Sequence, residues 1–258
     1  MRIVCIVDNY APLTSREILS EHGVSFMIED GDVRVLLDTS QTGRVLKHNA
    51  SVLGIDLSEI THVVLSHGHY DHTGGLRELL EYEPVVIASS HAFKPKYSKS
   101  RYIGSPVSLE EVEKRTEVIL RDEDYRISSE IILTGEIPRT NSFESSGEFF
   151  LDEERKTRDP LKDDRSLIVK DTLITGCCHA GIVNTLDYVE RKYEIRRIIG
   201  GLHLHSSSGE RISKTVERLK KKGYELFVGH CTGLNVLCRF SASGLSARPL
   251  HSGFTLEL

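Results

Sequence analysis

The sequence of 258 residues has no long hydrophobic run. No stretch approaches the roughly 18 apolar residues that a membrane-spanning helix needs. The apolar segment at residues 2–7 is short and meets Asp8 and Asn9, whereas a signal peptide has a longer apolar core and a cleavage site of small residues. We therefore expect a cytoplasmic protein that does not enter a membrane.

Cysteine is scarce and does not follow a structural pattern. The odd number and one adjacent pair do not fit a disulfide framework. No two cysteines have the C-x-x-C spacing of a structural zinc site. Cys177 and Cys178 are expected to be reduced and buried. The five cysteines are Cys5, Cys177, Cys178, Cys231 and Cys238.

An excess of positive charge is also missing. The formal net charge is -5, and basic residues are interspersed with acidic ones, so nucleic acid is not expected as a partner. A hydrophobic fraction of 39% with 28% charged residues describes an ordinary globular protein. The length suits one large core or two modest ones, and we predict a single domain over residues 1–258.

The most informative stretch is residues 66–75, Ser-His-Gly-His-Tyr-Asp-His-Thr-Gly-Gly. A β-branched segment at residues 61–65 precedes it, and leucines at helical spacing follow from Leu76. Three imidazoles and a carboxylate thus lie between a strand end and a helix start, where α/β scaffolds carry their chemistry. Such a loop predicts a metal site, because imidazole suits zinc, iron or nickel and carboxylate admits manganese.

Spacing within this loop divides its ligands into two pairs. His67 and His69 alternate, so a locally extended backbone points both imidazoles the same way, as one metal ion requires. Asp71 and His72 are adjacent and are expected to diverge. This second pair would suit a second ion beside the first.

Three further strands are expected to end in histidines. His179 follows the segment 172–175, His203 follows 196–200, and His230 follows 225–228. Strands of one sheet that end at the same edge would bring these residues together with the 66–75 loop, and open α/β folds bind ligands at such edges.

The segment from His67 to His72 resembles the H-x-H-x-D-H signature of the metallo-β-lactamase superfamily. This resemblance implies an α/β fold of the αββα four-layer sandwich type with a binuclear metal site. It implies that His67, His69 and His179 bind one ion. The ligands of the other ion would be Asp71, His72 and His230.

Asp38, which ends the expected strand 33–38, resembles the aspartate that braces the metal-binding loop in this superfamily. A structural turn or a helix cap is the alternative role for this residue.

One position departs from the superfamily pattern. A bridging aspartate usually follows a strand in a Gly-Asp pair, but here Gly176 is followed by Cys177. Either Cys177 bridges as a thiolate, or water alone bridges, or only one ion binds tightly. A thiolate would favour zinc. Glu136 is another candidate carboxylate.

Several motifs narrow the resemblance to one branch, and they cover nearly the whole chain. The branch comprises the 7,8-dihydropterin-6-methyl-4-(β-D-ribofuranosyl)-aminobenzene-5′-phosphate synthases of methanopterin biosynthesis. The motifs include Thr-Gly-Glu-Ile-Pro-Arg at 134–139, Asp-Asp-Arg-Ser-Leu at 163–167 and Gly-Cys-Cys-His-Ala-Gly-Ile-Val-Asn at 176–184.

We therefore predict a metal-dependent hydrolase or a synthase that acts on an anionic small molecule, phosphorylated or pterin-like. Two divalent ions are expected, zinc first, with iron or manganese as alternatives. They would activate water or act as Lewis acids. Asp71 and His203 are the expected catalytic residues, His203 as an acid or an anion contact, with a structural histidine as its alternative role.

The sequence is also compatible with other functions. A di-iron redox protein and a nucleic-acid-processing member of the superfamily are the alternative functions. The sequence predicts no oligomeric state. Residues 90–130 and 140–165 lack clear periodicity and are expected to be insertions. Lys96 and its basic neighbours in the first of them would either meet an anionic substrate or lie in solvent.

Overall fold

The computed structural model describes residues 1–144 and 147–258 and divides into two compact units. The first unit comprises residues 1–122, 148–163 and 251–258, and the second comprises residues 123–147 and 164–250. Each unit contains one seven-stranded β-sheet, so the α/β class is confirmed. That the chain forms a single domain stays a prediction.

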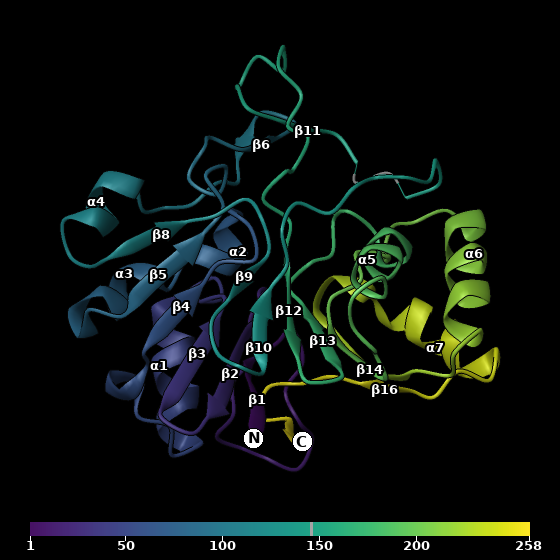
Figure 1. Ribbon diagram of the computed structural model, residues 1–258, viewed down its shortest axis with the longest axis horizontal. Coiled ribbons are helices and arrows are strands. Elements are labelled where there is room, and N and C mark those ends of the chain that lie inside the picture. Colours follow the sequence, from purple (N-terminus) through teal and green to yellow (C-terminus); the bar gives the residue numbers. More distant parts are fainter. Residues whose placement is uncertain (145–146) are drawn as a thin grey trace. The chain divides into compact units, whose positions relative to one another are not determined.

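The sheet of the first unit has the order β17-β1-β2-β3-β4-β5-β8 (Figure 1). Its strands are β1 (Arg2–Val7), β2 (Ser25–Asp30), β3 (Val33–Leu37), β4 (His62–Val64), β5 (Val85–Ala88), β8 (Val118–Leu120) and β17 (Thr255–Glu257). The hairpin β2–β3 forms as expected, because Gly31 at its turn has a φ of 59° that favours glycine. From β3 to β8 the strands are parallel, so their carboxyl ends meet at one edge.

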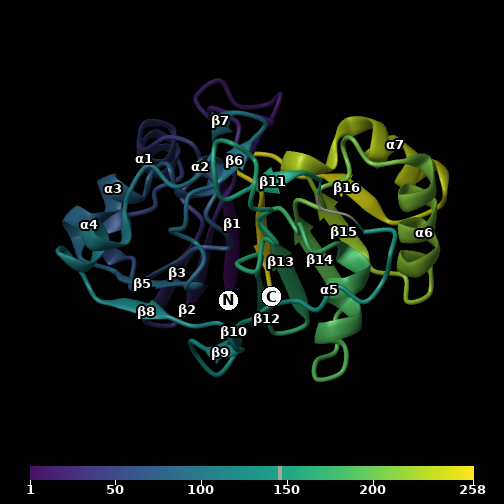
Figure 2. The same ribbon diagram turned by 90° about the horizontal axis from the view of Figure 1, so that it is seen from above.

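Helices of the first unit cover one face of this sheet (Figure 2). They are α1 (Gly43–Val52), α2 (Tyr70–Thr73), α3 (Leu76–Leu79) and α4 (Leu109–Glu113), with 3-10 turns η1 (Leu57–Glu59) and η2 (Leu80–Tyr82). Thr42 caps α1 by accepting a hydrogen bond from the Val45 amide. Val45 and Leu46 then pack against Met27 and Leu36 of the sheet in one hydrophobic core.

A small sheet in the first unit joins β11 (Phe149–Phe150), β6 (Tyr97–Ser98) and β7 (Arg101–Tyr102). Beside it lies Lys96, which is fully buried and forms ion pairs with Asp159 at 2.9 Å and Asp163 at 3.0 Å. The expectation that Lys96 lies in solvent was therefore wrong, and contact of this segment's basic residues with a substrate stays a prediction. The two carboxylates come from a segment more than sixty residues away, which local sequence does not show.

The sheet of the second unit has the order β16-β15-β14-β13-β12-β10-β9. Its strands are β9 (Tyr125–Arg126), β10 (Ile131–Leu133), β12 (Ser166–Val169), β13 (Thr172–Thr175), β14 (Arg197–Gly200), β15 (Glu225–Val228) and β16 (Ala247–Pro249). From β13 to β16 the strands are parallel. Their carboxyl ends therefore share one edge of this sheet.

Three helices lie on one face of the second sheet (Figure 2). They are α5 (Ile182–Val189), α6 (Gly209–Lys220) and α7 (Leu234–Ala242), and the turn η3 (His230–Thr232) follows β15. Apolar residues of each helix pack on Ile198 of β14 and its neighbours in a second core; examples are Leu186, Ile212 and Phe240.

The expected insertions contribute strands to these sheets. Within residues 90–130, β8 pairs with β5 and β9 pairs with β10, so both are edge strands. Residues 145 and 146, inside the expected insertion 140–165, lie outside the described residues. The role of both segments as insertions stays a prediction.

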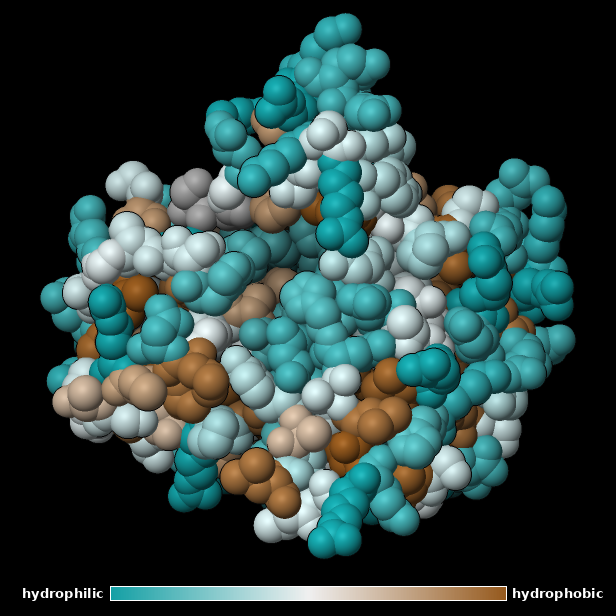
Figure 3. All heavy atoms as spheres, turned by 180° about the vertical axis from the view of Figure 1, so that it is seen from behind, coloured by the Kyte–Doolittle hydropathy of each residue, from teal (hydrophilic) through white to brown (hydrophobic). Residues whose placement is uncertain are grey.

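Hydrophilic side chains are interspersed with small apolar groups on the face drawn in Figure 3. In the part of the chain that the structure describes, none of the helices has the length and apolar character needed to cross a membrane. The cytoplasmic location stays a prediction.

The buried ion pairs of Lys96 lead to a prediction about stability. Burial alone would lower the pKa of Lys96, but Asp163 and Asp159 outweigh it and hold the pKa above its usual value. Lys96→Met would leave two buried carboxylates without their cation. We expect the free energy of unfolding in urea to fall by about 3–5 kcal/mol. Lys94→Met, at an exposed neighbouring lysine, should change it by less than about 0.5 kcal/mol; equal losses in both variants would contradict this account.

Candidate metal centre

The histidine loop of the first unit begins where β4 ends. The backbone is extended at His69 (φ -76°, ψ 148°), which immediately precedes α2. His67 Nε2 and His69 Nδ1 lie 2.9 Å apart, and both residues are buried. The expectation that alternate positions point both imidazoles the same way is confirmed. Two imidazole nitrogens at this separation can face one metal ion.

Asp71 and His72 lie on the single turn of α2. Asp71 Oδ2 is 3.6 Å from His72 Nε2, so the expected divergence of these neighbours was wrong: a helical turn replaces the extended chain on which adjacent side chains would face opposite ways. His22 Nε2 lies 3.2 Å from the same carboxylate oxygen. His22 stands alone in a polar segment, and nothing in its sequence surroundings indicates this contact.

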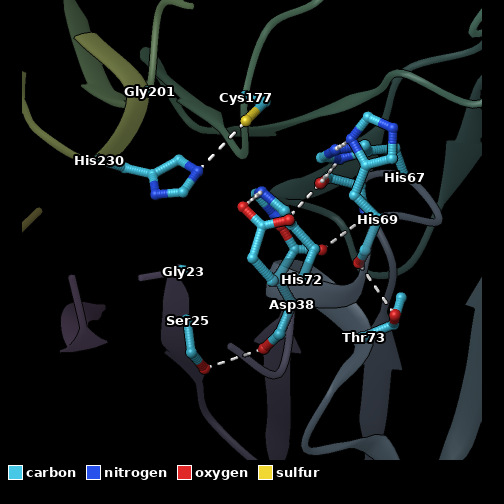
Figure 4. A network of polar contacts seen from close by, with 12 residues as sticks. Gly23, Ser25, Asp38, His67, His69, His72, Thr73, Cys177, Gly201 and His230 are labelled. Carbon is cyan, nitrogen blue, oxygen red and sulfur yellow. Dashed lines mark hydrogen bonds and ion pairs between the residues drawn. The ribbon is translucent and has the colours of Figure 1, made fainter. Parts of the chain in front are cut away.

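Asp38 is fully buried at the end of β3, and its carboxylate contacts the histidine loop (Figure 4). It accepts hydrogen bonds from the amide of Ser66 at 2.7 Å and from the Ser66 hydroxyl at 2.6 Å. A third bond, 2.6 Å long, joins it to Nδ1 of His72. Because an ionised carboxylate only accepts, Nδ1 of His72 carries the proton and Nε2 presents its lone pair.

The same carboxylate reaches His67 through Ser66. The Ser66 hydroxyl donates to Asp38 and lies 3.0 Å from Nδ1 of His67. Because the Ser66 hydroxyl gives its own proton to Asp38, it accepts a hydrogen bond from a protonated Nδ1 of His67. Nε2 is then the unprotonated nitrogen of the His67 ring. One buried carboxylate therefore sets the same tautomer in two of the loop histidines.

Gly68, between His67 and His69, is held by a hydrogen bond to a distant carboxylate. Its amide donates to Asp163 Oδ2 at 2.8 Å, and Asp163 is paired with Lys96. A Cβ atom at Gly68 would lie 1.7 Å from the carbonyl oxygen of Ala92. Only glycine lets the loop approach this closely.

In the second unit, three parallel strands deliver cysteine and histidine to one sheet edge. Cys177 Sγ lies 3.2 Å from Nε2 of His230, and Figure 4 draws this contact as a dashed line. Ligand atoms of Cys177, His179 and His203 all lie within 4.8 Å of one another. The expected convergence thus holds for β13, β14 and β15. The expectation that the strand before the 66–75 loop belongs to the same sheet was wrong, because β4 is part of the other large sheet.

Several residues at these strand ends have a left-handed backbone although they are not glycine. The φ angles are 59° at Asp38, 57° at Cys178, 49° at His203 and 45° at His230. This conformation costs of order 1 kcal/mol or more per residue. It persists where surrounding contacts enforce it, and it collects at functional sites.

Two polar residues that sequence reasoning did not assign support the His179 loop. Asp164 accepts a hydrogen bond from the Ala180 amide, and Arg139 donates to the carbonyl oxygen of His179, each at 2.8 Å. Both residues belong to motifs noted in the sequence, Asp-Asp-Arg-Ser-Leu and Thr-Gly-Glu-Ile-Pro-Arg. The motifs could have indicated their positions, but not their partners.

The donors present fit divalent transition metals. Imidazole nitrogens with fixed tautomers, a carboxylate and a thiol are the ligand types that zinc and iron take. Glu136 is exposed and belongs to no group of candidate ligands among residues 1–144 and 147–258. The assignment of His67, His69 and His179 to one ion, and of Asp71, His72 and His230 to another, stays a prediction.

Comparisons with known proteins agree on one family. The family model of the metallo-beta-lactamase superfamily matches residues 21–188. The protein MJ0448 of Methanocaldococcus jannaschii is 33% identical over 243 residues, which is 93% of each chain. The 7,8-dihydropterin-6-methyl-4-(beta-D-ribofuranosyl)-aminobenzene-5'-phosphate synthase of the same organism is 28% identical, over 90% of this chain and 88% of its own.

A solved structure extends this similarity to the whole fold. Tm1679, described as a metal-dependent hydrolase of the beta-lactamase superfamily, matches with a TM-score of 0.87 and 31% identity. The match covers 100% of this chain and 99% of that one. The expected sandwich fold of the metallo-β-lactamase type is thereby confirmed.

The contacts of Asp38 predict how metal affinity changes on substitution. Asp38→Asn keeps the shape of the side chain but removes the charge that orients His72 and Ser66. We expect metal affinity to fall about 10–100-fold, the usual effect of losing such a partner, when measured by competition with a chromophoric chelator.

Asp32→Asn, in the exposed turn between β2 and β3, is the matched control and should keep the parent affinity. Unchanged affinity in Asp38→Asn, with the fold verified by circular dichroism, would refute the orienting role.

Proposed function

The chain belongs to the metallo-β-lactamase superfamily, and we propose that it is a metal-dependent hydrolase of a phosphorylated or pterin-like small molecule. The observation that carries this proposal is the buried carboxylate of Asp38, which orients His67 and His72 so that Nε2 is the unprotonated nitrogen of each ring. A histidine pair that only stabilised the fold would not need two matched tautomers.

The proposed ligands are those that the superfamily motif implies. His67, His69 and His179 would hold one ion, and Asp71, His72 and His230 would hold the second. This assignment rests on the superfamily motif and on the order of the residues along the chain.

Zinc is the proposed metal, with iron and manganese as alternatives. Cys177 supports zinc, because a thiolate is a soft ligand and Cys177 lies beside His230. In this proposal Cys177 occupies the place of the bridging aspartate.

The bound ions would lower the pKa of a water molecule towards about 7 and stabilise negative charge that develops on the substrate. The protein itself supplies the proton transfers. Asp71 is the proposed acceptor for the proton of the attacking water, and His203 is the proposed donor to the leaving group.

A second candidate function is the synthase reaction. It is favoured by the 28% identity to the dihydropterin synthase over 90% of this chain. Hydrolysis is preferred because Tm1679, which matches over the whole chain, is described as a hydrolase. Both reactions would place an anionic substrate at the same residues.

The test of the proposed function is a hydrolysis assay with phosphate monoesters, phosphodiesters and thioesters. Activity should disappear with a chelator and return when zinc, iron or manganese is added. We expect His67→Ala to reduce kcat/KM about 100-fold or more.

Activity that survives both the chelator and His67→Ala would contradict the proposal. For the synthase reaction, ribofuranosyl-aminobenzene phosphate is supplied together with a dihydropterin whose 6-methyl carbon carries a diphosphate, which leaves as inorganic diphosphate when the new bond forms. Formation of the joined product without hydrolysis of any ester would favour the second candidate.

Elemental analysis tests the number of ions. We expect about two ions per chain in the parent protein and about one in His72→Ala, because His72 is a proposed ligand of the second ion only. His48→Ala, at an exposed histidine of α1, should retain both. Equal metal content in all three proteins would exclude His72 as a ligand of a tightly bound ion.

A further inference from the structure

We infer that the second unit contains a subsite for a phosphate group of the substrate, centred on Arg211. This inference rests on the proposed function and names the part of the substrate that the protein recognises. The subsite is a cavity of about 290 Å³. Its polar lining comes from His203, the serines at 206–208 and Arg211, with Phe143 as its aromatic member.

Arg211 is a buried cation that opens onto this cavity. It lies in the first turn of α6, and only 5% of its surface is exposed. Burial lowers the pKa of its guanidinium, and the nearby Glu144 opposes this effect. Arginine nevertheless stays charged in proteins, so this side chain favours an anion in the space that it lines.

Glu144 is the nearby carboxylate, and other groups already engage both of its oxygens. Oε1 accepts a hydrogen bond from the amide of Val183 at 2.9 Å, and Oε2 accepts from the amide of Asn184 at 2.8 Å. Asn141 donates to Oε2 as well. Glu144 therefore stabilises the start of α5 in addition to its electrostatic effect on Arg211.

The hydroxyl groups of Ser206 and Ser208 can donate to a tetrahedral oxyanion, whereas the Ser207 hydroxyl gives its proton to His203. The Ser207 hydroxyl donates to the carbonyl oxygen of His203 at 3.3 Å, and the Ser208 hydroxyl accepts from the Arg211 amide at 3.2 Å, so the rim has a defined shape. Ser206 is exposed at the same rim. Phosphate offers more acceptor oxygens than carboxylate, and guanidinium matches it with a paired geometry.

The acidic group nearest in sequence is Glu210, also in the first turn of α6. It forms an ion pair with Lys214 at 2.7 Å and is exposed. The positive end of the twelve-residue helix α6 adds a favourable potential for an anion.

His203 connects this subsite to the proposed reaction. Its ring centroid lies 4.2 Å from that of His179, and its ligand atom lies within 4.8 Å of those of Cys177 and His179. A phosphate held by Arg211 would thus lie on one side of His203 and the reacting bond on the other. The phosphate is then a recognition group that the reaction leaves intact.

The test is a titration of the metal-loaded protein with inorganic phosphate, followed by backbone amide NMR. Chloride at matched ionic strength gives the reference. The amides of residues 206–209 should shift with phosphate and not with chloride. Arg211→Lys keeps the charge but loses the paired geometry, and we expect at least about tenfold weaker binding.

Ser206→Ala, at an exposed position, should weaken phosphate binding several-fold without affecting the fold. Ser213→Ala, in the second turn of α6 and also at an exposed position, is the matched control. It should bind phosphate as the parent protein does. A titration of His67→Ala separates the subsite from the metal centre, and the shifts at residues 206–209 should persist there.

Shifts confined to residues 67–72, or equal shifts with chloride, would overturn the subsite while leaving the proposed function intact. Unchanged affinity in both Arg211→Lys and Ser206→Ala would overturn it as well. Phosphate binding at residues 206–209 that Arg211→Lys weakens, in a protein without metal-dependent hydrolysis, would support the subsite and reject the proposed function.

Discussion

The contact between Asp38 and the histidine loop is the interaction on which the candidate site depends. A buried carboxylate is costly unless donors satisfy it, and here the donors are Ser66 and His72. The loop must therefore close over the end of β3 in one conformation. In that conformation the Nε2 atoms of His67 and His72 are left unprotonated. The stability of the loop and the availability of its ligands thus have the same physical cause.

Each unit holds a histidine loop by the same means. In the first, Asp163 accepts the amide of Gly68; in the second, the next residue, Asp164, accepts the amide of Ala180. A hydrogen bond from a backbone amide to a carboxylate fixes the path of the chain independently of the neighbouring side chains. Such a charge-assisted hydrogen bond is stronger than one between neutral groups. These adjacent aspartates fix the backbone at Gly68 and Ala180, which are the sequence neighbours of His67, His69 and His179.

Local sequence patterns were enough for the strand–loop–helix order, the shared direction of His67 and His69, and the family. They failed where partners are distant or the backbone is unusual. The burial of Lys96 depends on Asp159 and Asp163, and no periodicity of residues 90–130 indicates those partners. The left-handed φ at His203 and His230 is imposed by surrounding contacts rather than by residue type. The sequence indicates only that Arg211 is a polar residue of an amphipathic helix, whereas the structure shows that its side chain is buried.

Anomalous diffraction from crystals of the zinc-loaded protein would test the central claim most directly. The account predicts zinc bound to Nε2 of His67 and to Nε2 of His72, with Nδ1 of His72 still hydrogen-bonded to Asp38. Zinc bound through Nδ1 of His72, zinc bound directly by Asp38, or zinc bound only at other residues would contradict it.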